Sequence, residues 1–537
     1  MSNPATFGTD RDKYQPYYTV INKKNYLFKA TFANADGYNV SFEKDAVLEL
    51  MINDSVYTPF KTGYIVINNT QDVIERYVNS PVNREFTPAL ASTPNQTGYQ
   101  TRGDTRDLLF LTIVPIEAGA QPYEQQSLAY NKFFGFNYVF SVTNEEDIET
   151  NDGKAKKYTI EDLDYVILKH KKLFFSSTQL LKATDTPYLN NYDRRAFTGD
   201  SLKYILQNGL ESPGAVYSTL SGSTVITPYF EQGVSKLFYS SPNDYTAYDD
   251  LMYVYKFHVS QSSGTDFSCL LKDYFTGEYT LESASSVFNK AYDKRTDSGS
   301  SYFIENLTIA GTQSPQANVL QNKLKKPLQA LEFGESGDVI SAKFFNTPGD
   351  ELQDKIKTIL VHKYDFELNL FTIDSINGDI QNVKTDFSNL YVNPMKGDNN
   401  APIPHLILNN TQKTNLNYEN RFLEYSEGDK NLRLAVGRNE LLKRILKLNL
   451  GVELIVQGGF QRKSGRFLSV DRTGTYIDNQ FDDKFLGIYF IIHVDHQFVN
   501  NNVFLNKILA VKTYHFTDPK YNENTPWQAK AQFYHNI

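Results

Sequence analysis

The first residues whose spacing could do chemistry are two histidines, His493 and His496, in the segment FLGIYFIIHVDHQF. Two imidazoles share a zinc ion only if both rings reach the same side of the chain. We predict a strand here, and strand residues three positions apart point to opposite faces. We therefore expect a structural role and no metal. Asp495 shares a face with His493, which favours a surface hydrogen bond over a catalytic dyad.

The single cysteine, Cys269, excludes an intrachain disulfide and a cysteine-based metal cluster. Its segment predicts a buried strand, so we interpret Cys269 as a core residue and not as a nucleophile activated by His258. The other histidines lie in no recognisable ligand spacing: His170, His362, His405, His515 and His535.

Two acidic runs are candidates for calcium binding or glycoside hydrolysis, Glu145-Glu146-Asp147 and Asp482-Asp483. The first lacks the alternating ligands of a calcium loop, and the second precedes a strand in a hairpin-like loop. We interpret both as solvated turns. Which carboxylates lie close together in the folded protein cannot be identified from a single sequence, so glycoside hydrolysis stays open.

Glycine-rich phosphate loops and serine nucleophile elbows are missing. Gln457-Gly458-Gly459 follows a strand without the Lys-Ser/Thr or G-x-G-x-x-G pattern that would complete a phosphate site, and GESGDV from Gly334 predicts a turn. We therefore predict no catalytic, cofactor-binding or metal-ligating residue and no cofactor.

A basic amphipathic helix is predicted from Arg438 to Lys447. We interpret its charges as a solvated or interface-facing stripe on a docked helix, with nucleic-acid binding as the alternative. The net charge of −8, from 54 basic and 62 acidic residues, argues against tight nonspecific DNA binding. It would suit a surface past which DNA slides. The residues concerned are Arg438, Lys443, Arg444 and Lys447 beside Leu441, Leu442, Ile445 and Leu446.

The chain is long enough for several cores. Its 537 residues indicate three or four domains, and 37 Tyr and 37 Phe favour strands and contact surfaces. The first residues contain no apolar signal region, and the longest apolar run, LLFLTIVPI from Leu108, is too short for a bilayer. We expect a soluble protein made in a reducing cytosol.

The N-terminal part, from Tyr26 to Ile167, is predicted to consist of strands. VLELMIND and YIVINN form a hairpin-like unit whose turn contains Pro59 and Gly63. RDLLFLTIVPI from Arg106 predicts a strand buried on both faces, and FNYVFSVTN alternates like a strand with one buried face. KKYTIEDLDYVILKH predicts a further strand that leads into a short helix.

The middle third is predicted to be α+β. TGDSLKYILQNGL has helical spacing, with Thr198 or Asp200 as N-cap and Gly209 near its end. AYDDLMYVYKFHVS predicts a second helix, and SCLLKDYFTGEYTLESAS predicts two short strands around Thr276-Gly277. We interpret three Ser-, Asn-, Gly- or Pro-rich stretches as loops or insertions: 211–243, 293–318 and 377–417. The predicted apolar face of the second helix contains Leu251, Val254, Tyr255 and His258.

The last hundred residues have the layout of a small β-barrel module. The basic helix leads into the strand LNLGVELIVQGG, and a polar loop leads to two long strands, FLGIYFIIHVDHQF and VFLNKILAVKTYHF. Val499-Asn500-Asn501-Asn502 joins these two strands as a hairpin. A similar, less regular pattern occurs near the N-terminus.

Three stretches resemble the central baseplate hub proteins of contractile-tailed, T4-type bacteriophages, and more distantly the N-terminal part of type VI secretion spike proteins. In chain order they are INDSVYTPFKTGYIVINN with DLLFLTIVPI and FNYVFSVTNEEDI; SLKYILQNGL with AYDDLMYVYKFHVS and SCLLKDYFTGEYTL; and RNELLKRILKLNLGVELIVQGG with LGIYFIIHVDHQF and FLNKILAVKTY. These are patterns of hydrophobicity and turns that cover most of the chain. The long inserts and the N-terminal tail depart from the family.

The resemblance implies a mainly β fold with α+β parts. We expect an N-terminal tail at 1–25, a first β-barrel domain of tail-tube or hub type with loop insertions at 26–196, and an α+β middle region with long inserted loops at 197–420. A second β-barrel domain at 421–518 and a C-terminal tail at 519–537 complete the expected organisation.

The resemblance implies a structural virion protein without enzymatic activity, assembled in the host cytoplasm and located in the tail baseplate. A homotrimer would place six barrels in a pseudo-sixfold ring that joins a threefold spike to a sixfold tail tube. Expected partners are the tail spike protein, the tail tube or tube-initiator protein and baseplate wedge proteins, with genomic DNA only transiently in the lumen and no membrane insertion.

Two alternatives stay open. One is another baseplate component, such as a wedge, distal-tail or fibre-attachment protein. The other is a carbohydrate-binding or carbohydrate-degrading tail protein, suggested by the aromatic content and the carboxylates. Trp527 is the only tryptophan, which disfavours tryptophan platforms for sugars.

Overall fold

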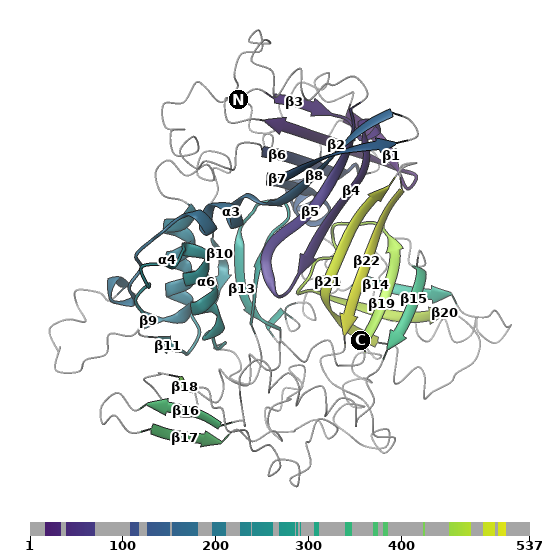
Figure 1. Ribbon diagram of the computed structural model, residues 1–537. Coiled ribbons are helices and arrows are strands. Elements are labelled where there is room, and N and C mark those ends of the chain that lie inside the picture. The colour runs from purple at the N-terminus through teal and green to yellow at the C-terminus, as the bar shows by residue number, and fades with distance from the viewer. Residues whose placement is uncertain are drawn as a thin grey trace, which may run out of the picture.

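One 14-stranded sheet forms the body of the protein (Figure 1). The structure is a computed structural model, and the residues that it describes are 17–33, 39–69, 108–117, 126–150, 153–180, 196–210, 226–237, 239–260, 268–284, 286–287, 290, 305–310, 339–345, 369–373, 380–384, 423–424, 451–473, 487–499 and 503–511. The sheet curls into two half-barrels, and a helical layer lies beside it. The mainly β fold with an α+β middle part is therefore confirmed.

The first half-barrel contains the N-terminal strands in the order β1-β2-β6-β7-β8-β5-β4, all antiparallel, with β3 beside β2. β6 is buried along its whole length, as predicted for a strand covered on both faces. Helix α2 (Leu128–Phe134) precedes β7. The strands are β1 (Tyr18–Ile21), β2 (Lys24–Ala33), β3 (Asn39–Phe42), β4 (Val47–Ser55), β5 (Thr58–Asn68), β6 (Leu108–Pro115), β7 (Phe136–Thr150) and β8 (Gly153–Asp162), with a 3-10 turn at Lys44–Ala46.

The second half-barrel has the order β15-β19-β22-β21-β20-β14. Its neighbouring strands are antiparallel except for the parallel pair β14 and β20. Its core is mainly aliphatic, with Val452, Leu454 and Ile508 among its buried residues. The strands are β14 (Glu305–Ala310), β15 (Val339–Phe345), β19 (Gly451–Gln457), β20 (Phe467–Thr473), β21 (Gly487–Val499) and β22 (Val503–Val511).

The helical layer packs against the hairpin of β12 (Ser268–Lys272) and β13 (Tyr279–Ser283). Its helices are amphipathic, and α6 begins with a capping box between Thr246 and Asp249. The remaining elements are α3 (Leu163–His170), α4 (Thr198–Leu210), α6 (Ala247–Lys256), a 3-10 turn at Ser177–Leu180, β9 (Ala196–Phe197), β10 (Ile226–Phe230) and β11 (Lys236–Leu237). A separate small sheet contains β16 (Asn369–Ile373), β17 (Ile380–Lys384) and β18 (Leu423–Glu424).

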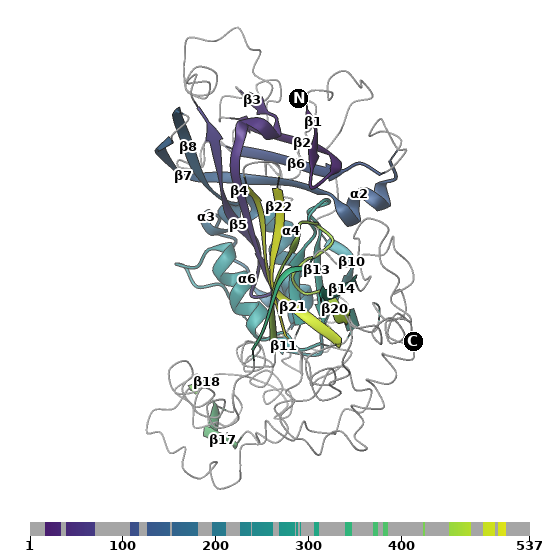
Figure 2. The ribbon, with the colours of Figure 1, turned by 90° about the vertical axis from the view of Figure 1, so that its right-hand side faces the viewer.

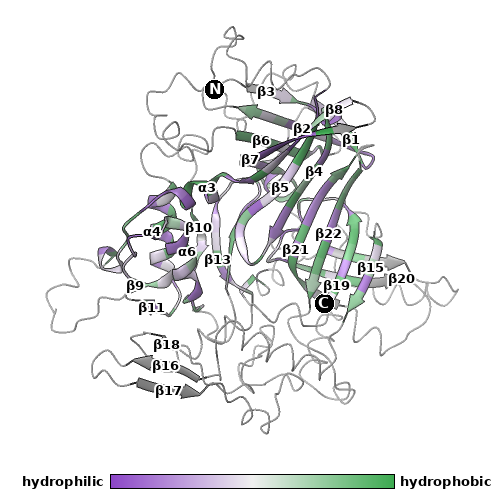
Figure 3. Cartoon of the chain, in the orientation of Figure 1, coloured by the Kyte–Doolittle hydropathy of each residue, from purple (hydrophilic) through white to green (hydrophobic). Residues whose placement is uncertain are grey.

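The sheet turns strongly along its length. In Figure 2, β6 and β7 run across the top of the molecule while β21 and β22 run down through it. Figure 3 shows hydrophobic residues along β6, whereas β21 and β22 also carry hydrophilic stretches. This pattern fits strands buried on both faces in the first case and on one face in the second.

Several predicted elements are confirmed. β8 leads into α3, α4 spans the predicted helical segment, and β12 and β13 flank Gly277, whose φ of 72° suits glycine in a turn. The closing hairpin is β21 and β22, with Val499 opposite Val503. Helix α4 begins at Thr198 and continues through Gly209 to Leu210.

Other predictions were wrong in detail. The β4–β5 turn lies at Val56-Tyr57, while Pro59 and Gly63 are inside β5. Helix α6 ends at Lys256, so His258 is not on its face. Glu145-Glu146-Asp147 lies within strand β7 and not in a turn, because it pairs with β8.

The three predicted insertions also contain strands. β10 and β11 lie within 211–243, β14 lies within 293–318 and β17 lies within 377–417. Their polar composition suggested loops, but β10 pairs with β13 and β14 pairs with β20. Tertiary pairing outweighs weak local β propensity here.

The two half-barrels repeat one topology. In the first, β4, β5, β6, β7 and β8 follow one another in sequence and take the spatial order β4-β5-β8-β7-β6. In the second, β15, β19, β20, β21 and β22 take the spatial order β15-β19-β22-β21-β20. Numbered by their position along the chain, both sets have the order 1-2-5-4-3, and every pair is antiparallel.

The repeat extends to the β-bulges. In the first strand of each set, a bulge lies between Val47 and Glu49 of β4 and between Val339 and Ser341 of β15. Bulges are local features of strand pairing that a chance similarity in strand order would not reproduce. The half-barrels are therefore an internal structural duplication.

A second pair of bulges supports the same correspondence. In the fourth strand of each set, one lies between Val142 and Asn144 of β7 and the other between Ile491 and His493 of β21. In each set, the first residue of the third strand pairs with the residue of the fourth strand that comes just before the bulge. Leu108 of β6 pairs with Ser141 of β7, and Phe467 of β20 pairs with Phe490 of β21.

Candidate functional site at the junction of the half-barrels

The half-barrels are joined through one long strand, β21. Its first part, from Gly487 to Phe490, pairs with β20, and its last part, from His493 to Phe498, pairs with β4 of the first half-barrel. The bulge after Ile491 separates the two parts. A single strand therefore belongs to both half-barrels and makes their sheets continuous.

An aromatic cluster packs beneath this joint. Phe460, in the loop after β19, is 1% exposed and belongs to the core of the first half-barrel. Its ring stacks on Phe136 at a centroid distance of 4.8 Å and lies 5.1 Å from Phe504. Phe504 in turn stacks on Phe498 at 3.9 Å. Aromatic pairs at these distances add to the stabilisation from burial.

Gly458 permits this close packing. A Cβ atom at position 458 would lie 2.0 Å from the ring of Phe504. Its backbone N–H donates to the carbonyl of Phe504 at 2.7 Å, and the N–H of Gly459 donates to Oδ1 of Asn506 at 2.5 Å. The glycines predicted to form a tight turn thus connect the loop to β22.

A buried carboxylate, Asp54 on β4, collects polar contacts from three parts of the chain. Oδ1 lies 3.3 Å from the ammonium group of Lys61, while Oδ2 accepts from the Tyr274 hydroxyl at 2.5 Å and from the backbone N–H of Ser464 at 2.8 Å. Burial alone would raise the pKa of Asp54, but Lys61 and the two hydrogen bonds lower it to about 2. Asp54 is therefore ionised at neutral pH.

His496 extends the network into the second half-barrel. Its Nε2 lies 3.0 Å from the Tyr274 hydroxyl, and its Nδ1 lies 2.5 Å from Nδ2 of Asn506. Because Tyr274 donates to Asp54, Nε2 carries the proton and Nδ1 accepts from Asn506. Burial lowers the pKa of His496 to about 3, and nearby charges including Asp54 oppose this shift only in part. The ring is neutral.

Arg462 and Glu305 complete the network at β14. Nε and Nη2 of Arg462 each donate to a carboxylate oxygen of Glu305 at 2.7 Å, a bidentate pair. Nη1 donates to the carbonyl of Gln457 and, at 3.3 Å, to Oδ1 of Asn506. Polar contacts therefore run without a break from β5 to β14.

A second ionic cluster lies under the helical layer. Nζ of Lys272 is 2.7 Å from Asp162 and 2.6 Å from Asp164, and all three side chains are buried. Lys61 joins the two clusters, since it donates to the carbonyl of Lys272 at 3.1 Å. Tyr138 donates to Asp162, and Tyr279 donates to Asp164 at 2.8 Å.

The two carboxylates of this cluster share one ammonium group. Burial raises the pKa of Asp164 to about 6, and Asp162 adds to the rise while Lys272 opposes it. Burial would lower the pKa of Lys272, but the two aspartates raise it above its usual value. Oδ1 of Asp164 is buried without a hydrogen-bond partner among the described residues, which fits its raised pKa.

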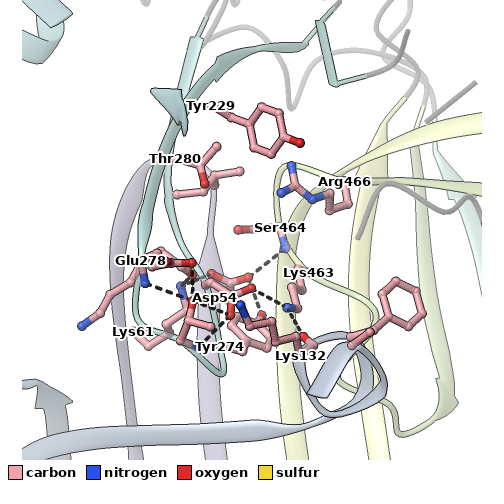
Figure 4. A pocket seen from close by; sticks show the side chains of 16 residues that line it. Asp54, Lys61, Lys132, Tyr229, Tyr274, Glu278, Thr280, Lys463, Ser464 and Arg466 are labelled. Carbon is pink, nitrogen blue, oxygen red and sulfur yellow. Dashed lines mark hydrogen bonds and ion pairs between the residues drawn. The ribbon is translucent and has the colours of Figure 1, made fainter. Parts of the chain in front are cut away.

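A cavity of about 310 Å³ opens beside Asp54 (Figure 4). The β12–β13 hairpin forms one wall, with Glu278 and Thr280, and the loop that carries Lys463 and Ser464 forms another. Lys463 pairs with Asp273 at 3.0 Å across the cavity edge. Three of the lysines that line the cavity are held in ion pairs, Lys61 with Asp54, Lys463 with Asp273, and Lys272 with Asp162 and Asp164, so these contacts connect separate segments of the chain.

The predicted site residues are distributed as follows. His496 is fully buried while His493 is partly exposed and hydrogen-bonded to Asp495 at 2.7 Å, so the opposite-face prediction is confirmed. Cys269 is buried on β12. No group of three His, Cys, Asp or Glu side chains suited to a metal occurs within the described ranges. The helix predicted at 438–447, Asp482-Asp483 and Gly334 lie outside the described residues.

The sequence did not reveal the residues of the network. Asp54 and Tyr274 are 220 positions apart, and Asp54 and Ser464 are 410 apart. One signal was present: Lys272 directly follows the apolar residues of β12, and a charge buried with such a strand has to be paired.

His496 makes the joint sensitive to acid. Unfolded, its ordinary pKa is 6.5, whereas the native pKa is about 3, so between these values only the unfolded chain binds the proton. Stability therefore falls as pH decreases through this window. Asp54, whose native pKa is about 2, adds to this loss of stability below pH 3.8. Asp164 has the opposite effect: its native pKa of about 6 makes the native protein bind a proton first, so acidification increases its contribution to stability.

We expect His496→Gln to reduce this acid sensitivity. Glutamine keeps a donor for Tyr274 but cannot titrate. The measurement is the thermal midpoint of the wild type and the variant at pH 7 and pH 4.5. The variant should lose fewer degrees between the two pH values than the wild type, and an equal loss would contradict the assignment.

The comparisons with known proteins concern the fold. The sequence matches no protein-family model and no curated protein. A tail protein from Neisseria meningitidis MC58 has a TM-score of 0.40 at 7% identity, over 90% of this chain and 96% of that one. The 43 kDa tail protein of prophage MuSo2 from Shewanella oneidensis has a TM-score of 0.39 at 9% identity, over 90% and 98%. The Francisella PdpA-VgrG complex has a TM-score of 0.37 at 10% identity, over 94% and 56%.

Proposed function

We propose that this protein is a structural virion protein, the central hub of a phage tail baseplate. The observation that carries the proposal is the internal duplication, in which both half-barrels share strand order, antiparallel pairing and the positions of two β-bulges. One chain thus presents two quasi-equivalent units, held together by β21.

The symmetry argument follows from this duplication. A homotrimer of a duplicated chain carries six similar units while keeping threefold symmetry. One side of such a ring can bind a threefold spike, and the other can bind a sixfold tail tube. The buried network at the joint holds the two units in one orientation, which a ring of alternating half-barrels requires.

The remaining parts of the proposal concern partners and place. We propose that the hub binds a tail spike protein, a tail tube or tube-initiator protein and baseplate wedge proteins, and that DNA passes through its lumen. It acts without enzymatic chemistry and resides in the virion after assembly in the host cytoplasm. Of the helices in the described ranges, none combines the length and the apolar character required to span a bilayer.

The test is the mass of the purified full chain in solution by light scattering, alone and with a candidate spike protein. We expect a particle of three protomers that co-elutes with the spike, with interfaces on the order of 2,000 Å² or more. A protein that stays monomeric with the spike present would contradict the proposal. A peripheral position in labelled particles would instead support a wedge, distal-tail or fibre-attachment protein.

A further inference from the structure

Several strand edges have no partner strand among the described residues, and two of them belong to β15, the last strand of the sheet order, and to the end of β7. β15 pairs only with β19. In β7, the part after Ser141 extends beyond the pairing with β6 and is paired only with β8. Exposed edges of this kind are able to add another strand.

The internal duplication relates these two edges to the joint inside the chain. β15 corresponds to β4, because both are the first strand of their set and carry the same bulge. The end of β7 corresponds to the end of β21, because both follow the bulge of the fourth strand. Since β4 pairs with the end of β21, their counterparts β15 and β7 form the same kind of complementary pair.

We propose that β15 of one copy pairs antiparallel with the end of β7 in a second copy, and that this pairing is the contact between subunits. The inference rests on the proposed function and deepens it. Within one chain the two strands are not paired, and β8, β5, β4, β21, β22 and β19 lie between them in the sheet. In Figure 1, β7 lies in the upper middle of the view and β15 lies toward its right-hand side.

The duplication also gives the register. Met51 lies two residues after Glu49, where regular pairing resumes beyond the bulge, as Lys343 does after Ser341. Gln497 of β21 is the partner of Met51 and lies four residues after His493.

On β7, Ile148 lies four residues after Asn144 and therefore takes the place of Gln497. Lys343 is thus expected opposite Ile148 of the second copy. Two further pairs follow from the same count: Ala342 with Glu149 and Phe345 with Glu146.

Backbone direction agrees with this pairing. A Cβ atom built on Gly63 of β5 would lie 1.9 Å from the carbonyl oxygen of Met51, so the backbone polar groups of Met51 face β5. Donors alternate along a strand, so the N–H groups of Leu50 and Ile52 point toward β21 and that of Met51 points away from it. Lys343 and Ile148 thus form a pair without direct backbone hydrogen bonds, where side chains come closest.

Charge favours β15 on β7 over two identical edges together. The outer part of β7 carries Glu145, Glu146 and Asp147, so two copies of β7 would place like charges side by side. β15 carries the basic Lys343 and no acidic residue.

The contact is head to tail, and such contacts close into rings or continue as filaments. In a ring, each joint within a chain alternates with an equivalent joint between chains, so all half-barrels meet their neighbours in one way. Three copies then give six joints of a single kind.

The experiment is disulfide cross-linking of the full chain carrying Lys343→Cys and Ile148→Cys. The native Cys269 is buried, which limits unwanted cross-links. The matched control carries Lys343→Cys and Asn144→Cys, since Asn144 lies roughly 13 Å further along the strand. Each single cysteine variant serves as a second control. Light scattering of the untreated protein reports the assembly independently of the cross-link.

We expect oxidation of the in-register pair to give covalent dimers and a band of three protomers, at least tenfold more than the control pair. Cross-links in larger or open assemblies would support the strand pairing but contradict the trimeric hub. A particle of three protomers without in-register cross-links would overturn the pairing and leave the hub proposal standing. A monomer without cross-links would overturn both.

Discussion

Phe460→Ala is expected to destabilise the joint of the half-barrels by about 3 to 5 kcal/mol. The ring is buried between Phe136 of the first half-barrel and Phe504 of the second. Removing it leaves a cavity whose walls belong to strands of both half-barrels. These walls are fixed by strand pairing, so they cannot easily collapse into the space.

The measurement combines chemical denaturation with hydrogen exchange of the β4 and β21 amides. Hydrogen exchange should accelerate most at the amides where β4 and β21 pair. The substitution lowers the free energy needed for local opening, and it does so most at the joint. Phe174→Ala is the matched control, since Phe174 is 63% exposed and loses the same atoms. We expect it to change stability by no more than about 0.5 kcal/mol. A cost for Phe460→Ala similar to that of the control would contradict its role.

Local patterns predicted much of the fold. The apolar run of β6, the helical spacing of α4 and the closing hairpin of β21 and β22 all rest on residues close in sequence. Their periodicity is a direct consequence of which face each element buries.

The duplication was only partly predictable. A looser repetition between the two ends of the chain was visible, but the strand order was not. β15 and β19 pair across more than a hundred residues, and β14 joins β20 from a segment with the composition of a loop. Strand order is set by long-range pairing, on which local propensity has little influence.

The joint shows why the site escaped prediction. Its polar residues come from β4, β5, the β12–β13 hairpin, β14, β21, β22 and the loop after β19. No spacing pattern links them, since each contributes only one or two side chains. Of the two histidines considered as metal ligands, His496 is a neutral hydrogen-bonding residue inside the joint, where it contacts Tyr274 and Asn506.

Lys272→Met is expected to cost about 3 to 5 kcal/mol, because it leaves two buried carboxylates without their shared cation. Asp162 and Asp164 lie within 2.7 Å of the ammonium group that is removed. Methionine keeps most of the side-chain volume, so the loss reports charge and not packing. Lys157→Met is the control, because Lys157 is partly exposed and its pair with Glu146 is long, at 3.7 Å; a change within about 1 kcal/mol is expected.

The pH dependence identifies the cause. In Lys272→Met, Asp164 loses the cation that holds its pKa down, so its native pKa rises further above that of the unfolded chain. The native variant then takes up protons on acidification, and the stability gap to the wild type should narrow between pH 7 and pH 4.5. Adding Asp162→Asn and Asp164→Asn should recover much of the loss at pH 7, since asparagine also caps α3, whose N-cap is Asp162. A gap that is independent of pH, or no recovery in the triple variant, would show that Lys272 acts through packing alone.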